Sequence, residues 1–263
     1  MPELPEVQTI VDDLSRYLPG LNVRSFKELN PLASGNGRMC EPSSIDFSKK
    51  IKGQKIISVS RRAKTLVFEL ENNYLLVHLK MTGQLVYRSC AEKDCEVVAG
   101  GHPIVGVGQE LPNKFTRGHF ILSDGSDLFF NDVRRFGWLK LVSKEEYQKY
   151  EQELGIEPFS EEFTLAYFTR MLERKKSATI KQAILEQKYL VGVGNIYADE
   201  ALFEAKIKPH RQAGSLSAEE IKALWRIIPK LLAKAIKFRG TSFNDYRDAH
   251  GRKGNFVSQL KVY

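Results

Sequence analysis

The sequence predicts an α+β protein with a β-rich N-terminal half and a helical C-terminal half. Between residues 22 and 142, short apolar and β-branched runs alternate with turn signals. From Ser143 onward, apolar residues recur at helical spacing. The chain has 263 residues, of which 42% are hydrophobic, so it can form one large domain or two moderate ones around a sizeable core.

A helix is expected at the N-terminus. Its apolar positions are Val7, Ile10, Val11, Leu14, Tyr17 and Leu18, and Pro19-Gly20 ends the run. Pro5 and Glu6 suit a first helical turn, where Glu3 and Glu6 favour the positive end of the helix dipole. The start MPELPE also allows a chemical interpretation. Once Met1 is removed, Pro2 carries a secondary amine with a pKa of about 8, which is partly neutral and nucleophilic, beside a carboxyl group that can move protons.

Five runs predict the strands of a β-sandwich or barrel-like domain. They are KIISVS (55–60), TLVFEL (65–70), YLLVHL (74–79), GHFIL (118–122) and DLFFND (127–132). Asn72-Asn73, Gly100-Gly101 and Asp124-Gly125 are turn signals between them. Residues 89–114 are glycine-rich and are expected to form a long surface loop.

Five segments of the second half have helical periodicity. They are SKEEYQKYEQEL (143–154), SEEFTLAYFTRML (160–172), SATIKQAILEQ (177–187), NIYADEALFEA (195–205) and SAEEIKALWRIIPKLLAKAIKF (217–238). Ser215–Glu219 resembles a capped helix start. We therefore divide the chain into an N-terminal domain (1–142), a hinge (143–159), a helical domain (160–239) and a tail (240–263).

The stretch KYLVGVGNIYADE (188–200) joins two of these helices. Gly192 and Gly194 permit tight turns, and Asn195 is a candidate cap for the following helix. A helix, two turns and a second helix would direct several backbone N–H groups outward, which suits a phosphate. The alternative is a compact helical hairpin without a ligand.

Charge and cysteine content restrict the functional class. The net charge of +8 and the grouping of basic residues at 49–64, 134–135, 170–181 and 237–253 favour a polyanionic partner over a set of solvated faces. Cys40, Cys90 and Cys95 are an odd number, which argues against a disulfide framework and fits a reducing compartment. No apolar run approaches the roughly 18 residues of a membrane span, so we expect a cytoplasmic protein that does not bind membranes.

Seven motifs together resemble the formamidopyrimidine-DNA glycosylase and endonuclease VIII family. They are PELPEV (2–7), RRAKTL (61–66), HLKMTG (78–83), DVRRFG (132–137), LGIEP (154–158), LVGVGNIYADEALF (190–203) and GTSFNDY (240–246). The resemblance covers essentially the whole chain. It implies an N-terminal helix plus a two-layered β-sandwich domain, joined to a helical domain with a helix–two-turn–helix motif.

The resemblance also implies an activity: base-excision repair of oxidised purines such as 8-oxoguanine and formamidopyrimidines in duplex DNA. Pro2 would act as the nucleophile and form a Schiff base, and β,δ-elimination would follow. Glu3 matches the family's proton-transfer carboxylate, and Glu6 a supporting one. Lys64 matches a lysine that contacts the phosphate or the damaged base; judged alone, it is equally an ordinary basic turn residue.

DNA contacts are implied at six positions. Met81, Arg134 and Phe136 match the residues that fill the gap left by a flipped nucleotide, Asn195 matches a phosphate contact, and His78 and Tyr246 complete the set. The tail segment 240–255 matches the loop that closes over the flipped base. For Met81 and Phe136, the alternative is burial in the sandwich core.

The family usually continues past Val262-Tyr263 into a zinc finger with four cysteines, whereas this chain stops there, so it is either truncated before the finger or a zinc-less variant. The three cysteines have no paired CxxC spacing, so we expect no metal site and no cofactor within these residues. We expect a monomer whose partner is damaged double-stranded DNA. Three alternatives stay open: an endonuclease VIII-like glycosylase for oxidised pyrimidines, a non-catalytic damaged-DNA-binding protein, and a small-molecule enzyme that uses an N-terminal proline.

Overall fold

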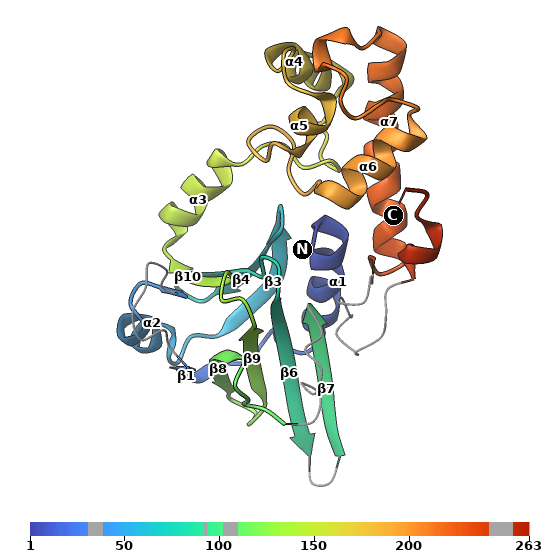
Figure 1. The fold of residues 1–263 in the computed structure, drawn as a ribbon. Coiled ribbons are helices and arrows are strands. Elements are labelled where there is room, and N and C mark those ends of the chain that lie inside the picture. Colours follow the sequence, from blue (N-terminus) through green and yellow to red (C-terminus); the bar gives the residue numbers. More distant parts are fainter. Residues whose placement is uncertain (31–38, 92–93, 102–109, 242–254, 263) are drawn as a thin grey trace.

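The structure is a computed structural model that describes residues 1–30, 39–91, 94–101, 110–241 and 255–262. A β-sandwich and a group of helices lie at opposite ends of the molecule, with helix α1 between them (Figure 1). The predicted α+β class is confirmed. No helix among the described residues is long and apolar enough to cross a membrane.

Two five-stranded sheets enclose the core of the sandwich. The first has the order β1 (Val23–Glu28), β8 (Thr116–Leu122), β9 (Asp127–Asp132), β6 (Gly83–Ala91) and β7 (Asp94–Gly101). The second has the order β2 (Cys40–Glu41), β10 (Trp138–Val142), β5 (Tyr74–His78), β4 (Thr65–Leu70) and β3 (Ile56–Arg62). Neighbouring strands are antiparallel except for β2 and β10. Side chains from both sheets, such as Phe68 and Phe120, form one buried cluster.

Helix α1 (Leu4–Leu14) links the two parts of the molecule. It contacts β3 and β7, the edge strands of the two sheets, and also α7. Val7, Ile10 and Leu14 belong to the sandwich core, whereas Leu4 belongs to the buried cluster of the helical half. The first turn of α1 therefore lies at the junction of the two cores. The helix ends at Leu14 and does not reach Leu18 as its apolar periodicity predicted.

The predicted loop at residues 89–114 is wrong over much of its length, because β6 and β7 form a hairpin. Gly100 and Gly101 lie within β7 and are not a turn. A Cβ at Gly100 would approach Ile10 Cγ1 to 2.6 Å, so glycine is required there by the close packing of α1 on β7. Helix α2 (Ser44–Ile51), which packs beside β1, was not predicted either.

The helical half contains α3 (Lys144–Glu153), α4 (Leu165–Arg174), α5 (Ile180–Leu185), α6 (Asn195–Glu204) and α7 (Ala218–Lys237), with short 3₁₀ turns at Ala213–Ser215 and Phe256–Gln259. Ser143, Thr164, Thr179 and Ser217 cap four of these helices through their side-chain oxygens. The cap of α7 is thus two residues later than predicted. The separate buried cluster of this half agrees with a second domain, while the limits that we assigned to the domains stay predictions.

Candidate active site

The first residues of the chain pack against the N-terminus of α6. The Glu3 carboxylate accepts hydrogen bonds from the backbone N–H groups of Gly194 (2.7 Å) and Ile196 (3.0 Å). Glu3 is 3% exposed, and Pro2 is buried as well. A residue almost 200 positions away in the sequence therefore occupies the positive end of this helix, where a carboxylate is favoured.

The glycines of LVGVGN make this contact possible. A Cβ at Gly194 would lie 2.2 Å from Glu3 Cδ, and a Cβ at Gly192 would lie 2.4 Å from Leu4 Cδ1. Gly192 also has a φ of +85°, which favours glycine. Our interpretation that these N–H groups point outward toward a phosphate is wrong for Gly194 and Ile196, because Glu3 accepts their hydrogen bonds. Asn195 does not cap the helix: Gly194 is the N-cap residue, and Asn195 is the exposed first residue of α6.

Burial gives Glu3 the properties of an acid that works near neutral pH. It raises the pKa of Glu3 to about 7, whereas the charge of Lys64 and the two backbone hydrogen bonds act in the opposite direction. Lys64 is 7% exposed, and burial lowers its pKa, while the charges of Glu3 and Glu6 raise it. Lys64 is therefore not an ordinary exposed turn residue. It lies within electrostatic reach of both carboxyl groups.

Glu6 connects three segments of the chain. Its Oε1 accepts hydrogen bonds from the Tyr197 hydroxyl (2.6 Å) and from the backbone N–H (2.8 Å) and hydroxyl (3.0 Å) of Thr241. Its Oε2 accepts the N–H of Glu3 at 2.9 Å. Burial and the neighbouring Glu6 keep the pKa of Tyr197 well above its usual value, so this hydroxyl stays a donor. These bonds hold the peptide that follows Pro2 in one orientation.

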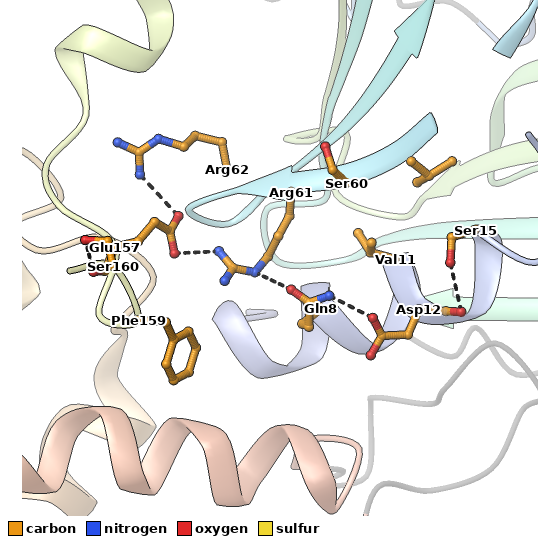
Figure 2. A pocket seen from close by; sticks show the side chains of 11 residues that line it. Gln8, Val11, Asp12, Ser15, Ser60, Arg61, Arg62, Glu157, Phe159 and Ser160 are labelled. Carbon is orange, nitrogen blue, oxygen red and sulfur yellow. Dashed lines mark hydrogen bonds and ion pairs between the residues drawn. The ribbon is translucent and has the colours of Figure 1, made fainter. Parts of the chain in front are cut away.

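Glu157, in the hinge, holds the turn that carries Lys64. Glu157 accepts hydrogen bonds from Arg61 Nη1 (2.8 Å), Arg62 Nη1 (3.1 Å) and the backbone N–H of Ala63 (2.7 Å). Ala63 has a φ of 55°, which is uncommon for a residue with a side chain. Figure 2 shows these arginines beside a pocket of about 590 Å³ between α1, β3 and the hinge. Of the described residues that line this pocket, none is a predicted site residue.

Met81, Arg134 and Phe136 form an exposed group at the end of the first sheet. Met81 is 44% and Phe136 54% exposed, so burial in the sandwich core is excluded for both. The Arg134 guanidinium lies 4.8 Å from the centre of the Phe136 ring, and its Nη1 lies 3.1 Å from Met81 Sδ. The structure thus brings together the three side chains to which the resemblance assigned one role. We call them the wedge residues below.

His78 lies at the end of β5, on the strand that leads to Met81. Burial lowers the pKa of His78 to about 3, so the ring is neutral at physiological pH. Its Nδ1 accepts the backbone N–H of Lys80 at 3.0 Å, which assigns the ring proton to Nε2. His78 can therefore donate one hydrogen bond to a ligand. Tyr246 lies outside the described residues.

Among the described residues, no group of three or more His, Cys, Asp or Glu side chains is arranged to hold a metal ion. The described residues therefore supply no set of ligands for a zinc ion.

Comparisons with known families agree with this geometry. Residues 1–139 match the formamidopyrimidine-DNA glycosylase N-terminal domain, and residues 154–247 match the formamidopyrimidine-DNA glycosylase H2TH domain. The chain belongs to the formamidopyrimidine-DNA glycosylase family. Proteins named formamidopyrimidine-DNA glycosylase from Pelotomaculum thermopropionicum and Desulfitobacterium hafniense are each 40% identical to it over all of this chain and 88% of their own length.

Solved structures of the Lactococcus lactis protein share the fold. A mutant in complex with DNA that contains Fapy-dG has a TM-score of 0.84 and 30% identity, over 100% of this chain and 88% of the other. A complex with abasic-site DNA has a TM-score of 0.82 and 30% identity, over 99% and 87%. A wild-type complex with DNA that contains an oxidised pyrimidine has a TM-score of 0.83 and 30% identity, over 100% and 88%.

Several residues of the site were not singled out in the sequence. They are Thr82, Asp132, Glu157, Tyr197 and Thr241, all buried or partly buried and all engaged by side-chain hydrogen bonds. Each lies inside one of the seven motifs, so membership of a motif was the available signal. Apart from the N–H groups of Arg134 and Gly137 that Asp132 accepts, their partners are distant in the sequence, and for that reason no local pattern indicated these contacts.

Proposed function

We propose that the protein is a bifunctional DNA glycosylase and abasic-site lyase that removes oxidised purines from duplex DNA. The observation that carries the proposal is the burial of Pro2 and Glu3 together. Glu3, a carboxyl group with a pKa of about 7, directly follows the residue that becomes the terminal amine once Met1 is removed. Expulsion of a base requires a nucleophile with a general acid beside it.

In the proposed reaction, the Pro2 nitrogen attacks the sugar C1′ of the damaged nucleotide. The bond from C1′ to the base breaks, and the base leaves with the bonding electrons and takes up the proton that the Pro2 nitrogen loses. Neutral Glu3 donates a proton to the ring oxygen, the sugar opens, and Pro2 and C1′ remain joined as an iminium. Loss of the 2′ proton then breaks the C3′–O bond, and a second elimination breaks the C5′–O bond. The Lys64 charge would hold a phosphate or the base.

DNA as the partner is supported by charge and by the wedge residues. The net charge of +8 suits the phosphate backbone, and His78 and Asn195 supply donors for phosphate. C1′ is hidden inside a duplex, so the nucleotide has to be flipped out, and an exposed Met, Arg and Phe can fill the gap. The Lactococcus lactis complexes contain damaged DNA of three kinds, which further supports this partner.

A panel of duplexes tests the proposal. Single 8-oxoguanine, formamidopyrimidine, oxidised pyrimidine and abasic sites are incubated with the protein, and released bases and strand breaks are measured separately. We expect excision of both purine lesions, with strand cleavage on both sides of the sugar. Faster excision of the pyrimidine lesion would replace the substrate class by that of the endonuclease VIII branch. Tight binding without any excision or cleavage would favour the non-catalytic alternative.

Arg134→Ala should damage base excision more than abasic-site cleavage, because an abasic nucleotide is already unstacked and costs less to flip. It should also reduce the preference among bases opposite the lesion, since an arginine pair with a base carries about 1–3 kcal/mol of discrimination. Initial rates on 8-oxoguanine paired with each base measure both effects. Arg135→Asn is the control, because Arg135 is an exposed neighbour with a φ of 59°, which Asn tolerates. Equal losses in the two variants would contradict the assignment.

A further inference from the structure

The wedge residues come from two different loops, each of which connects the two sheets, at the same end of the sandwich. Met81 lies between β5 and β6, and Arg134 and Phe136 lie between β9 and β10. Strands β6 and β9 are paired, with Gly83 opposite Asp132, so the two loops start side by side. Each loop contains a residue with a left-handed backbone, Lys80 (φ 50°) and Arg135 (φ 59°). Such conformations persist where surrounding contacts hold them.

A buried hydroxyl and a buried carboxylate tie these loops together. The Thr82 hydroxyl, in the loop of Met81, donates a hydrogen bond to Asp132 Oδ1 and accepts the backbone N–H of Arg134 at 3.0 Å. Asp132 Oδ1 also accepts the Arg134 N–H (3.1 Å), and Oδ2 accepts the Gly137 N–H (2.7 Å). Asp132 is 0% exposed and Thr82 9% exposed. The two residues therefore span both loops below the exposed wedge.

Few other side chains could replace Thr82 in this arrangement. A hydroxyl is a single group that can donate and accept at the same time, and Thr82 does both, with one partner in β9 and one in the following loop. An apolar side chain of equal size would leave a carboxylate oxygen and an N–H with one partner fewer in a buried site. Without this connection, Met81 and Arg134 would have more freedom to move relative to each other, and aligning them on binding would cost free energy.

We propose that Thr82 is a positioning residue for lesion recognition: its hydroxyl sets the Met81 loop in register with the Arg134–Phe136 loop, so that the three wedge residues enter the duplex as one preorganised unit. This inference rests on the proposed function for its kinetic consequences. Its structural content, the coupling of the two loops in the free protein, does not depend on any activity.

Two matched variants test it. Thr82→Val removes the hydroxyl and keeps the shape, whereas Thr82→Ser keeps the hydroxyl and removes a methyl group. We expect Thr82→Val to lower excision of 8-oxoguanine about tenfold and to reduce the opposite-base preference, with cleavage at a preformed abasic site within about twofold of wild type. Thr82→Ser should stay within about twofold in all three measurements. Thermal unfolding of each variant is measured to test whether it is folded at the assay temperature.

The second measurement is the ¹³C-methyl NMR signal of Met81 in the free protein, assigned with Met81→Leu. It should move toward the position of an unrestrained methionine in Thr82→Val and stay unchanged in Thr82→Ser. If the wild-type protein excises nothing, the proposed function fails, but this signal still decides the role of Thr82. An unchanged Met81 signal in Thr82→Val, or equal losses in both reactions, would overturn the proposal. If Thr82→Val does not fold, Thr82→Ala, which leaves space for water at Asp132, is used instead.

Discussion

A single extra residue attached to the nitrogen of Pro2 should abolish covalent trapping of this protein on damaged DNA. With that residue attached, the Pro2 nitrogen is an amide and cannot attack C1′. The structure contains such a residue: Met1 is 53% exposed, while Pro2 is buried and the contacts of Glu3 are formed. A chain with a glycine preceding Pro2, left by cleavage of a tag, should therefore fold equally well. Borohydride reduction on 8-oxoguanine duplexes should trap the chain that begins at Pro2 at least about a hundredfold more than the extended one.

Two substitutions show which amine reacts. Pro2→Gly retains a terminal amine, so trapping should continue at a changed rate and map to residue 2 by mass spectrometry of the digested adduct. Lys64→Arg keeps the positive charge but removes the primary amine that lies near the two carboxyl groups, so trapping at Pro2 should persist. An adduct that maps to Lys64, or trapping of the extended chain at the wild-type rate, would reject Pro2 as the nucleophile. Binding of both chains to duplexes with an abasic-site analogue is the control for DNA access.

Five of the ten strands in the described part of the chain, β3, β4, β5, β8 and β9, were predicted, because their signals are local. TLVFEL and DLFFND match β4 and β9 residue for residue, since turn-forming pairs bound them on at least one side. Strand β7 was missed because its glycines look like a turn in the sequence. Gly100 is required because Ile10, about 90 residues earlier, packs onto β7, whereas Gly101 has a φ of 123° and lies against the backbone of Gly83 and Gln84. A glycine required by close packing cannot be told from a glycine required by a turn without the partner that packs on it.

The contacts of the candidate active site could not be predicted for the same reason, because the partners are distant in the sequence. The residue types at Pro2 and Glu3 suggested the chemistry proposed for them, and the resemblance supplied Lys64 and grouped Met81 with Arg134 and Phe136. What the sequence could not show is that Glu3 occupies the start of α6 or that Glu6 receives the Tyr197 hydroxyl. These contacts join segments that are almost 200 residues apart, and they arise only when the two cores meet around α1. The burial that raises the pKa of Glu3 is a result of this packing of the two cores around α1.

Glu3→Gln should lower base excision by about a hundredfold or more, because a positioned acid contributes on the order of 10²–10⁴ to such steps. The amide keeps the size of the side chain but has no acidic proton that it can transfer to the sugar ring oxygen. Single-turnover release of 8-oxoguanine measures the loss. Gln8→Glu is a matched control that changes the charge on the same helix at a residue that does not contact Gly194 or Ile196. Wild-type excision by Glu3→Gln would remove Glu3 from the chemistry.

The same variant should change how stability depends on pH. The pKa of Glu3 is about 7 in the folded protein, whereas a glutamate in an unfolded chain titrates near 4.5. Because the folded state holds its proton more tightly, the contribution of Glu3 to stability is fully present below about pH 4.5 and is lost as the pH rises through 7. A shift of this size corresponds to about 3 kcal/mol. Denaturant unfolding of the glycine-extended chain, with and without Glu3→Gln, should show the wild-type side chain losing stability relative to Gln between pH 5 and 8. A difference between the two curves that stays constant over this range would mean that Glu3 does not titrate there, and it would contradict both its raised pKa and its assignment as the acid.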